Sequence, residues 1–112
     1  MKHFDENEFT MNGISVFDKM DKNLLQELDS LRELCGFPLL INSSWRSEEY
    51  NKAVGGSKGS YHKKGRAIDL HCTSSTQRKD IVKHALNLGL SCGVARTFIH
   101  CDNRDKQILF TY

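Results

Sequence analysis

The sequence predicts a small α+β domain with a central antiparallel sheet and two main helices. In the segment 21–35, apolar residues recur at intervals of four, three and four, which is the pattern of an amphipathic helix. Farther along, short apolar segments are separated by glycine and polar turns, which is typical of strands. The strands gather toward the C-terminal half instead of alternating strictly with helices, and this favours the α+β class. At 112 residues, we expect a single domain over residues 1–112.

Composition and charge exclude several classes of protein. The chain is 38% apolar and 27% charged, which is typical of a globular protein and not of a disordered one. The formal net charge is only +2 and no basic stripe is present, so we expect no nucleic-acid partner. No segment approaches the ~20 apolar residues of a membrane span, so we expect no membrane partner either. We expect a monomer.

The N-terminal residues and the cysteines bear on the cellular compartment. The opening residues 1–8 are polar and lack the apolar segment of a signal peptide, so we expect the chain to be cytoplasmic as synthesised. No CxxC pair occurs, and in a reducing compartment we expect four free, mostly buried thiols. These are Cys35, Cys72, Cys92 and Cys101.

Three helices are expected, of which one is short. The first spans residues 21–35, with Asp18 or Asp21 as its cap and Gly36 and Pro38 as its end. A short helix follows Ser47 and ends at the two glycines 55–56. The last helix follows the polar segment 73–76, whose final residue is expected to cap it, and ends at Gly89.

Five strands are expected, at 39–43, 66–72, 90–94, 98–101 and 107–112. The first is apolar, and we expect it to be buried. The later strands are expected to pair antiparallel. Residues 103–106 form a polar turn between the last two. The apolar residues of the segment up to Met20 show no clear helical or strand periodicity. We expect its phenylalanines, Phe4, Phe9 and Phe17, to anchor the segment on the core.

Side-chain alternation along two of these strands predicts a polar site. Successive side chains point to opposite faces of a strand, so Asp69 and His71 share a face with Ala67. In the later strand, His100 and Asp102 share a face with Phe98. If the two strands are neighbours, Asp69 and His100 converge on one side, while the isoleucines and cysteines between them enter the core.

Asp69 and His100, together with His62, form a candidate metal site. Imidazole nitrogen and carboxylate oxygen both bind zinc, and three protein ligands leave a fourth position open for water, as in catalytic zinc sites. The alternative is two ordinary surface histidines and a salt-bridged aspartate. His71 is an alternative ligand or an exposed side chain, and we expect His84 to be solvated.

Two further side chains stand near these residues in the sequence. Arg46 either pairs with Glu48 or Glu49, or serves as a fixed cation for a substrate carboxylate or carbonyl. Ser60 either caps a turn or donates a hydrogen bond to a ligand.

The motif Ser60-x-His62-x-x-Gly65-x-Ala67-x-Asp69 resembles the signature of the zinc D-Ala-D-Ala carboxypeptidases and the related L-alanyl-D-glutamate endopeptidases, whose metal site hedgehog domains share. The upstream segment 41–51 resembles the family's arginine-bearing segment, and residues 98–104 resemble the segment with the third ligand. Together with the opening residues, these segments resemble the short, single-domain branch of the family that is common in phages and prophages.

The resemblance implies a hedgehog-like or D,D-peptidase-like fold, with zinc at His62, Asp69 and His100. It implies that Arg46 orients a peptidoglycan stem peptide, that Ser60 contacts the substrate or supports the site, and that a zinc-bound water attacks an amide carbonyl. Without a signal peptide, a phage holin or tail would supply the route to the cell wall.

One departure concerns the general base. Related peptidases usually carry an acidic residue three positions before the last ligand or a histidine two positions before it, where this chain has Thr97 and Phe98. Asp102 is the nearest substitute as a catalytic residue, or else it orients His100. The alternative function is therefore a non-catalytic zinc module that binds a cell-wall fragment or a protein.

Overall fold

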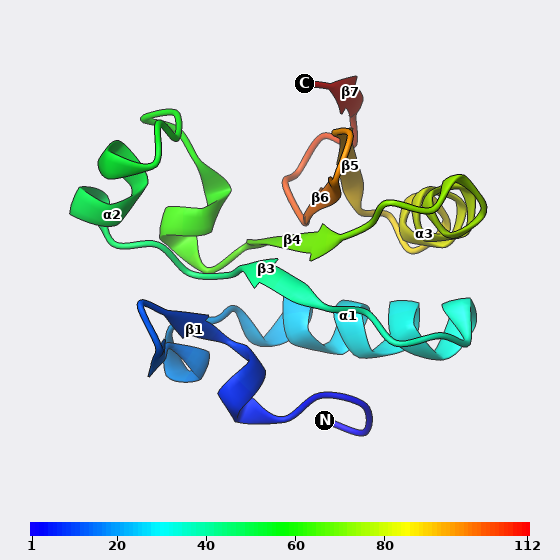
Figure 1. The fold of residues 1–112 in the computed structure, drawn as a ribbon, viewed down its shortest axis with the longest axis horizontal. Helices are drawn as coiled ribbons and strands as arrows, with labels where there is room; N and C mark the ends of the chain where they lie inside the picture. The colour runs from blue at the N-terminus through cyan, green and yellow to red at the C-terminus, as the bar shows by residue number, and fades with distance from the viewer.

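A five-stranded sheet forms the centre of the fold (Figure 1), in a computed structural model that describes residues 1–112. Its strands are β3 (Ile41–Ser43), β4 (Ala67–His71), β5 (Ser91–Val94), β6 (Phe98–Asp102) and β7 (Leu109–Thr111). Their order in the sheet is β3-β4-β6-β5-β7, with three antiparallel pairs and a parallel pair between β5 and β7. The predicted α+β class is confirmed.

The position of β7 corrects the expectation of antiparallel pairing throughout the C-terminal half. β6 already has β4 on one side and β5 on the other, so no edge of β6 is open to the next strand. Residues 103–108 therefore carry the chain past β5, and β7 pairs with β5 in parallel, with Gly93 opposite Phe110.

The first strand is shorter and less buried than expected. β3 begins at Ile41 and not at Leu39, and Leu40 is 62% exposed. Because β3 is the edge strand beside β4, only part of its surface is covered. Leu39 nevertheless lies in the core.

The first long helix, α1 (Lys22–Cys35), has the predicted ends. The side chain of Asp21 accepts a hydrogen bond from the Leu24 N–H at 3.0 Å, and such a cap typically contributes about 0.5–2 kcal/mol. Gly36 ends the helix in the left-handed conformation, at φ 74°. The helix buries four leucines, each contributing about 1.5–3 kcal/mol when fully buried; they are Leu24, Leu25, Leu28 and Leu31.

The other helices are α2 (Glu48–Ala53), capped by Ser47 as predicted, and α3 (Ser75–Asn87). The cap of α3 is Ser74, whose hydroxyl accepts from the Gln77 N–H at 3.2 Å. The helix therefore begins earlier than a cap at Thr76 would allow. None of the three helices combines the length and the apolar character needed to cross a bilayer.

One hydrophobic core joins the sheet to α1 and α3. Figure 1 shows α1 running along the sheet beside β3, with α3 next to β5 and β6. The cysteines lie there as expected: Cys72, Cys92 and Cys101 are buried, Cys35 is half-buried, and all four are free thiols. The core also takes in residues from every main element, among them Phe9, Leu24, Leu28, Leu31, Leu39, Ile68, Leu70, Ile81, Leu90 and Ile99.

The N-terminal segment contains a small hairpin that the sequence analysis missed. β1 (Thr10–Met11) and β2 (Ile14–Ser15) are joined by Asn12 and Gly13, which both have positive φ. An Asn-Gly pair is the strongest short-range signal for such a turn, so the sequence did contain the information. The expected anchoring is confirmed, since Phe4 and Phe9 are buried and Phe17 packs against the core.

Candidate metal centre

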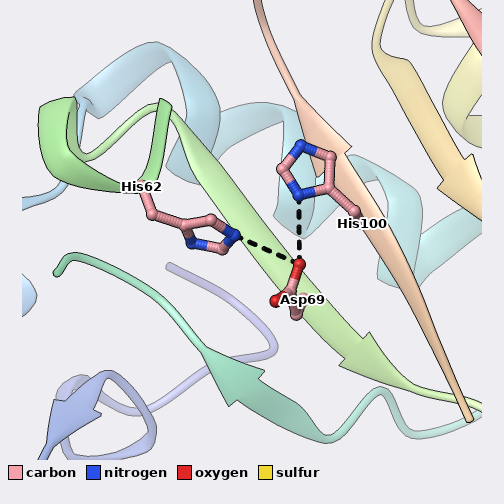
Figure 2. A group of neighbouring side chains, drawn as sticks. All are labelled: His62, Asp69 and His100. Carbon is pink, nitrogen blue, oxygen red and sulfur yellow. Dashed lines mark hydrogen bonds and ion pairs between the residues drawn. The ribbon is translucent and has the colours of Figure 1, made fainter. Parts of the chain in front are cut away.

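The side chains of His62, Asp69 and His100 converge from three separate segments of the chain (Figure 2). His62 Nε2 lies 3.2 Å from Asp69 Oδ1, and His100 Nδ1 lies 3.1 Å from the same oxygen. All three residues are buried, and their candidate ligand atoms lie within 4.8 Å of one another. The structure thus brings together the three residues that the sequence singled out.

Strand register places two of these residues. β4 and β6 pair antiparallel with Asp69 directly opposite His100, while the neighbouring pair, Ile68 and Cys101, points into the core. Side-chain alternation therefore puts the polar pair on one face of the sheet and the apolar pair on the other.

A 3₁₀ turn, η3 (Tyr61–Lys64), places His62. Ser60 caps this turn, since its hydroxyl accepts from the His62 N–H at 3.2 Å, and Gly65 ends it in the left-handed conformation. The Arg46 N–H donates to the His62 carbonyl at 3.1 Å, which ties the turn to the segment after β3. Ser60 is thus the turn cap that the sequence analysis considered, and it also lines the cavity over the site.

The hydrogen bonds of the two imidazoles leave their inner nitrogens facing Asp69. His62 Nδ1 lies 2.8 Å from the Ser44 carbonyl, and His100 Nε2 lies 2.7 Å from Asp102 Oδ2. These oxygens only accept, so each outer nitrogen carries a proton and donates. If the imidazole is neutral, its other nitrogen, His62 Nε2 or His100 Nδ1, has no proton and directs a lone pair toward Asp69. Either both rings take a second proton or a metal ion lies between the three groups, and the residues therefore fit a metal ion.

The site favours an ionised carboxylate. Burial raises the pKa of Asp69, but hydrogen bonds from His100 and His62 outweigh it and hold that pKa well below its usual range. Burial lowers the pKa of His100, whereas its hydrogen bonds to Asp102 and Asp69 raise it, and the net shift is upward. Asp69 is therefore a permanent negative charge at neutral pH, which attracts a cation.

Arg46 is held beside the candidate metal centre by all of its nitrogen groups. Nη2 donates to Asp69 Oδ2 at 3.2 Å, Nε to Ser43 Oγ at 3.0 Å, and Nη1 to Asn51 Oδ1 at 3.2 Å. The alternative of an ion pair with Glu48 or Glu49 is not what the structure contains. The Arg46 side chain is 14% exposed and lines the cavity, so its guanidinium is a fixed cation at the site.

Asn51 is a supporting residue that the sequence analysis missed. It is buried, it accepts from Arg46, and its Nδ2 donates to the Ser57 carbonyl at 2.8 Å. Asparagine is unfavourable inside a helix because its side chain competes for backbone hydrogen bonds. Its presence within the short α2 was therefore the available signal.

Asp102 lies beneath His100 and outside the cavity. It is wholly buried, and besides His100 it accepts from the Arg104 backbone N–H, Nε and Nη2 at 3.1, 2.8 and 2.6 Å. Burial raises the pKa of Asp102, but hydrogen bonds from Arg104 and His100 lower it well below the usual range. This geometry favours the orienting role over that of a general base.

A cavity of about 580 Å³ opens over the three converging residues. Its lining includes the glycine-rich segment 54–60 and the guanidinium groups of Arg46 and Arg104. Asp69 is its only side-chain carboxylate. Aromatic and aliphatic side chains complete it, namely Tyr61, Phe98, Ile108, Phe110 and Tyr112.

The remaining histidines lie elsewhere. His71 is exposed at the end of β4, opposite Phe98, and is no alternative ligand in this arrangement. His3 pairs with Glu33 on the surface. His84 lies on α3 and is half-buried, whereas the sequence analysis expected it to be solvated.

Comparison with known proteins agrees with this geometry. The family model described as Peptidase M15 matches residues 2–102. No match was found among curated proteins. The matched range contains Arg46 and all three converging residues, and it covers most of the described elements. The chain belongs to the Peptidase M15 family.

Proposed function

We propose that the protein is a zinc-dependent peptidase that cleaves peptidoglycan stem peptides, as a D,D-carboxypeptidase or an endopeptidase. The observation that carries this proposal is the buried convergence of His62, Asp69 and His100 beside the fixed cation of Arg46, at the base of a cavity. Membership of the Peptidase M15 family supports a metallopeptidase.

In this proposal, the zinc ligands are His62 Nε2, Asp69 Oδ1 and His100 Nδ1. A zinc ion there would activate a water molecule and polarise the amide carbonyl. The protein's part is to hold the two imidazoles in the correct tautomer, through the Ser44 carbonyl and Asp102.

Arg46 would bind a carboxylate or carbonyl oxygen of the substrate. Its planar, permanently charged group suits carboxylates, and its hydrogen bonds to Ser43, Asn51 and Asp69 fix its position before the substrate arrives. Ser60 stands at the rim of the same cavity and would contact the peptide.

Metal removal tests the proposal directly. The purified protein is expected to contain one zinc ion per chain, to release D-alanine or a shorter peptide from muropeptides, and to lose this activity after chelation. Adding zinc back should restore it. Mass spectrometry of the native protein measures the zinc, and chromatography of the muropeptides identifies the bond that is cut. Failure to bind any divalent metal would contradict the proposal.

A non-catalytic zinc module is the second candidate, because the cavity offers no evident general base. Its only side-chain carboxylate is Asp69, which would serve as a ligand, and Phe98 lines the cavity where related peptidases carry a histidine. One zinc ion per chain together with tight muropeptide binding and no products would favour this candidate.

Replacing Asp102 by asparagine separates an orienting role from that of a general base. The amide cannot accept as strongly from His100 and Arg104, so we expect zinc affinity to fall about 10–100-fold. At saturating zinc, the rate constant kcat should return to within a few-fold of wild type. Competition with a fluorescent chelator measures the affinity.

The matched control is Asp105→Asn, because Asp105 is exposed and pairs only loosely with Arg66, at 3.6 Å. It should change neither zinc affinity nor kcat. A drop of about 10²–10⁴-fold in kcat for Asp102→Asn at saturating zinc would instead identify Asp102 as the general base.

Peptidoglycan lies outside the cytoplasmic membrane, so the proposed substrate also requires a route of export. We propose a phage or prophage route through a holin or a tail, with the protein acting as a monomer.

A further inference from the structure

The parallel strand β7 carries two aromatic side chains into the cavity. Phe110 and Tyr112 are two residues apart, so they point to the same face of the strand, and both line the cavity. The Tyr112 N–H donates to the Val94 carbonyl at 3.1 Å, which extends the pairing between β5 and β7 as far as Tyr112. Pairing with β5 thus determines where Tyr112 lies.

Gly93 determines how closely these rings approach the candidate metal centre. The Phe110 ring lies across Gly93, where a Cβ atom would come within 2.4 Å of Phe110 Cε2 and Cζ. The same ring lies 5.7 Å from the His100 ring, centroid to centroid. A glycine on β5 therefore lets the aromatic side chains of β7 pack against a candidate zinc ligand.

Tyr112 is held by two rings of this group. Its ring centroid lies 5.0 Å from that of Phe98 and 5.6 Å from that of Phe110. Phe98 occupies the position where related peptidases carry a histidine, and Tyr112 packs beside it in the lining of the same cavity.

The phenol of Tyr112 remains protonated at neutral pH. Tyr112 is 69% exposed as a whole, and partial desolvation of its phenol, followed by the negative charge of Asp69, raises its pKa to about 12. The charges of Arg46 and Arg104 oppose this shift and are outweighed. Tyr112 lines the same cavity as Asp69 and Arg46, and its neutral phenol can donate a hydrogen bond to a ligand there.

We propose that Tyr112 is a catalytic residue that donates a hydrogen bond to the oxygen of the scissile carbonyl as that oxygen gains negative charge. The assignment rests on the proposed peptidase function. No bond forms to Tyr112 and its proton stays on the phenol, so the residue acts only by stabilising charge. A single donor of this kind typically contributes about 10²–10³-fold in kcat.

Tyr61 is the competing phenol in the cavity, but its surroundings differ. Its ring faces three cations, with Arg104, Lys64 and Arg66 at 4.9, 5.0 and 5.5 Å from the centroid. Such contacts use the face of the ring and favour a role in holding Arg104. The ring contacts of Tyr112 are with Phe98 and Phe110, and its ring faces none of these cations.

The test compares Tyr112→Phe with wild type and with Tyr50→Phe, the same change on α2 outside the cavity. Removing only the hydroxyl keeps the ring contacts with Phe98 and Phe110. For Tyr112→Phe we expect kcat to fall about 10²-fold with KM and zinc content unchanged. Tyr50→Phe should match wild type in all three measurements.

A second readout does not depend on turnover. Calorimetry should show that a phosphinate analogue of D-alanyl-D-alanine, which is tetrahedral and anionic, binds zinc-loaded Tyr112→Phe about 10²-fold more weakly than wild type. Free D-alanine should bind both equally. Equal binding of the phosphinate to both proteins would overturn the assignment. A wild-type protein that binds the phosphinate through Tyr112 but cleaves no peptide would count against the proposed function alone.

Discussion

Replacing Asp69 by alanine is expected to abolish the proposed zinc binding and, with it, the proposed peptidase activity. Asp69 Oδ1 faces both histidines, and Oδ2 accepts a hydrogen bond from Arg46. The substitution therefore removes a candidate metal ligand and also the carboxylate that contacts these three side chains. Two histidines alone form an incomplete zinc site. Zinc per chain, measured by native mass spectrometry, should fall to background, and muropeptide products should disappear.

The same substitution should also destabilise the metal-free protein. Removing one member of a buried ion pair typically costs about 3–5 kcal/mol, because the other charge stays buried without a partner. Arg46 borders an open cavity that water can enter, so we expect the lower end of that range in urea denaturation. Asp69→Asn should bind equally little zinc yet lose less stability, since its amide oxygen still accepts from Arg46.

Asp105→Ala is the control for Asp69→Ala, because it removes an exposed carboxylate near the end of β6. Its zinc content and stability should match wild type. Full zinc loading of Asp69→Ala would show that the metal, if any, is bound elsewhere, and would contradict the candidate site.

Gly65→Ala is expected to be among the most destabilising single changes in the chain, at about 2–5 kcal/mol. Gly65 has φ +69°, where an L-residue costs roughly 1–2 kcal/mol. In addition, a Cβ atom would lie 2.1 Å from the Lys19 carbonyl oxygen and 3.1 Å from Met20 Cα. These are backbone atoms that no rotamer change can move, and overpacking of this kind typically costs about 1–3 kcal/mol more.

The contact also matters for the metal site. The Gly65 carbonyl accepts from the Asp21 N–H at 2.9 Å, so the end of the His62 turn is joined to the start of α1. Displacing this turn should weaken zinc binding as well as lower the urea midpoint. Against a typical total stability of 5–15 kcal/mol, the loss is large enough to leave part of the protein unfolded.

Gly36→Ala is the matched control. Gly36 has φ +74°, nearly the same as Gly65, but no atom lies within 4 Å of its added Cβ. Only the conformational cost remains, so we expect a loss of about 1–2 kcal/mol and unchanged zinc affinity. If the two variants lost equal stability, the contact between Gly65 and the 19–20 backbone would not be the cause.

The parts of the fold that follow from local rules could be predicted. Side-chain alternation placed Asp69 and His100 on one face, and the caps at Asp21 and Ser47 were visible in the sequence. The pairing of β7 could not be predicted in this way, because it depends on β6 being flanked on both sides by strands distant in sequence.

In the candidate site, too, some features could be predicted from the sequence and others could not. Its three converging residues have side-chain types that bind metals, whereas the group that holds His62 in its tautomer is the backbone carbonyl of Ser44. Every residue has such a carbonyl, so no residue type marks it. Likewise, the burial of Asp102 under His100 depends on Arg104 folding back over it, which is a matter of tertiary packing.

The edge position of β7 has a consequence for how the cavity works over time. β4 and β6, which carry Asp69 and His100, each pair with two strands, whereas β7 pairs only with β5. Segments with fewer partners open at lower free energy than the centre of a sheet. We therefore expect backbone amides of β7 to exchange with deuterium earlier than those of β4 and β6. The candidate metal ligands would then stay in place while the side of the cavity formed by Phe110 and Tyr112 opens and closes around the proposed peptide substrate.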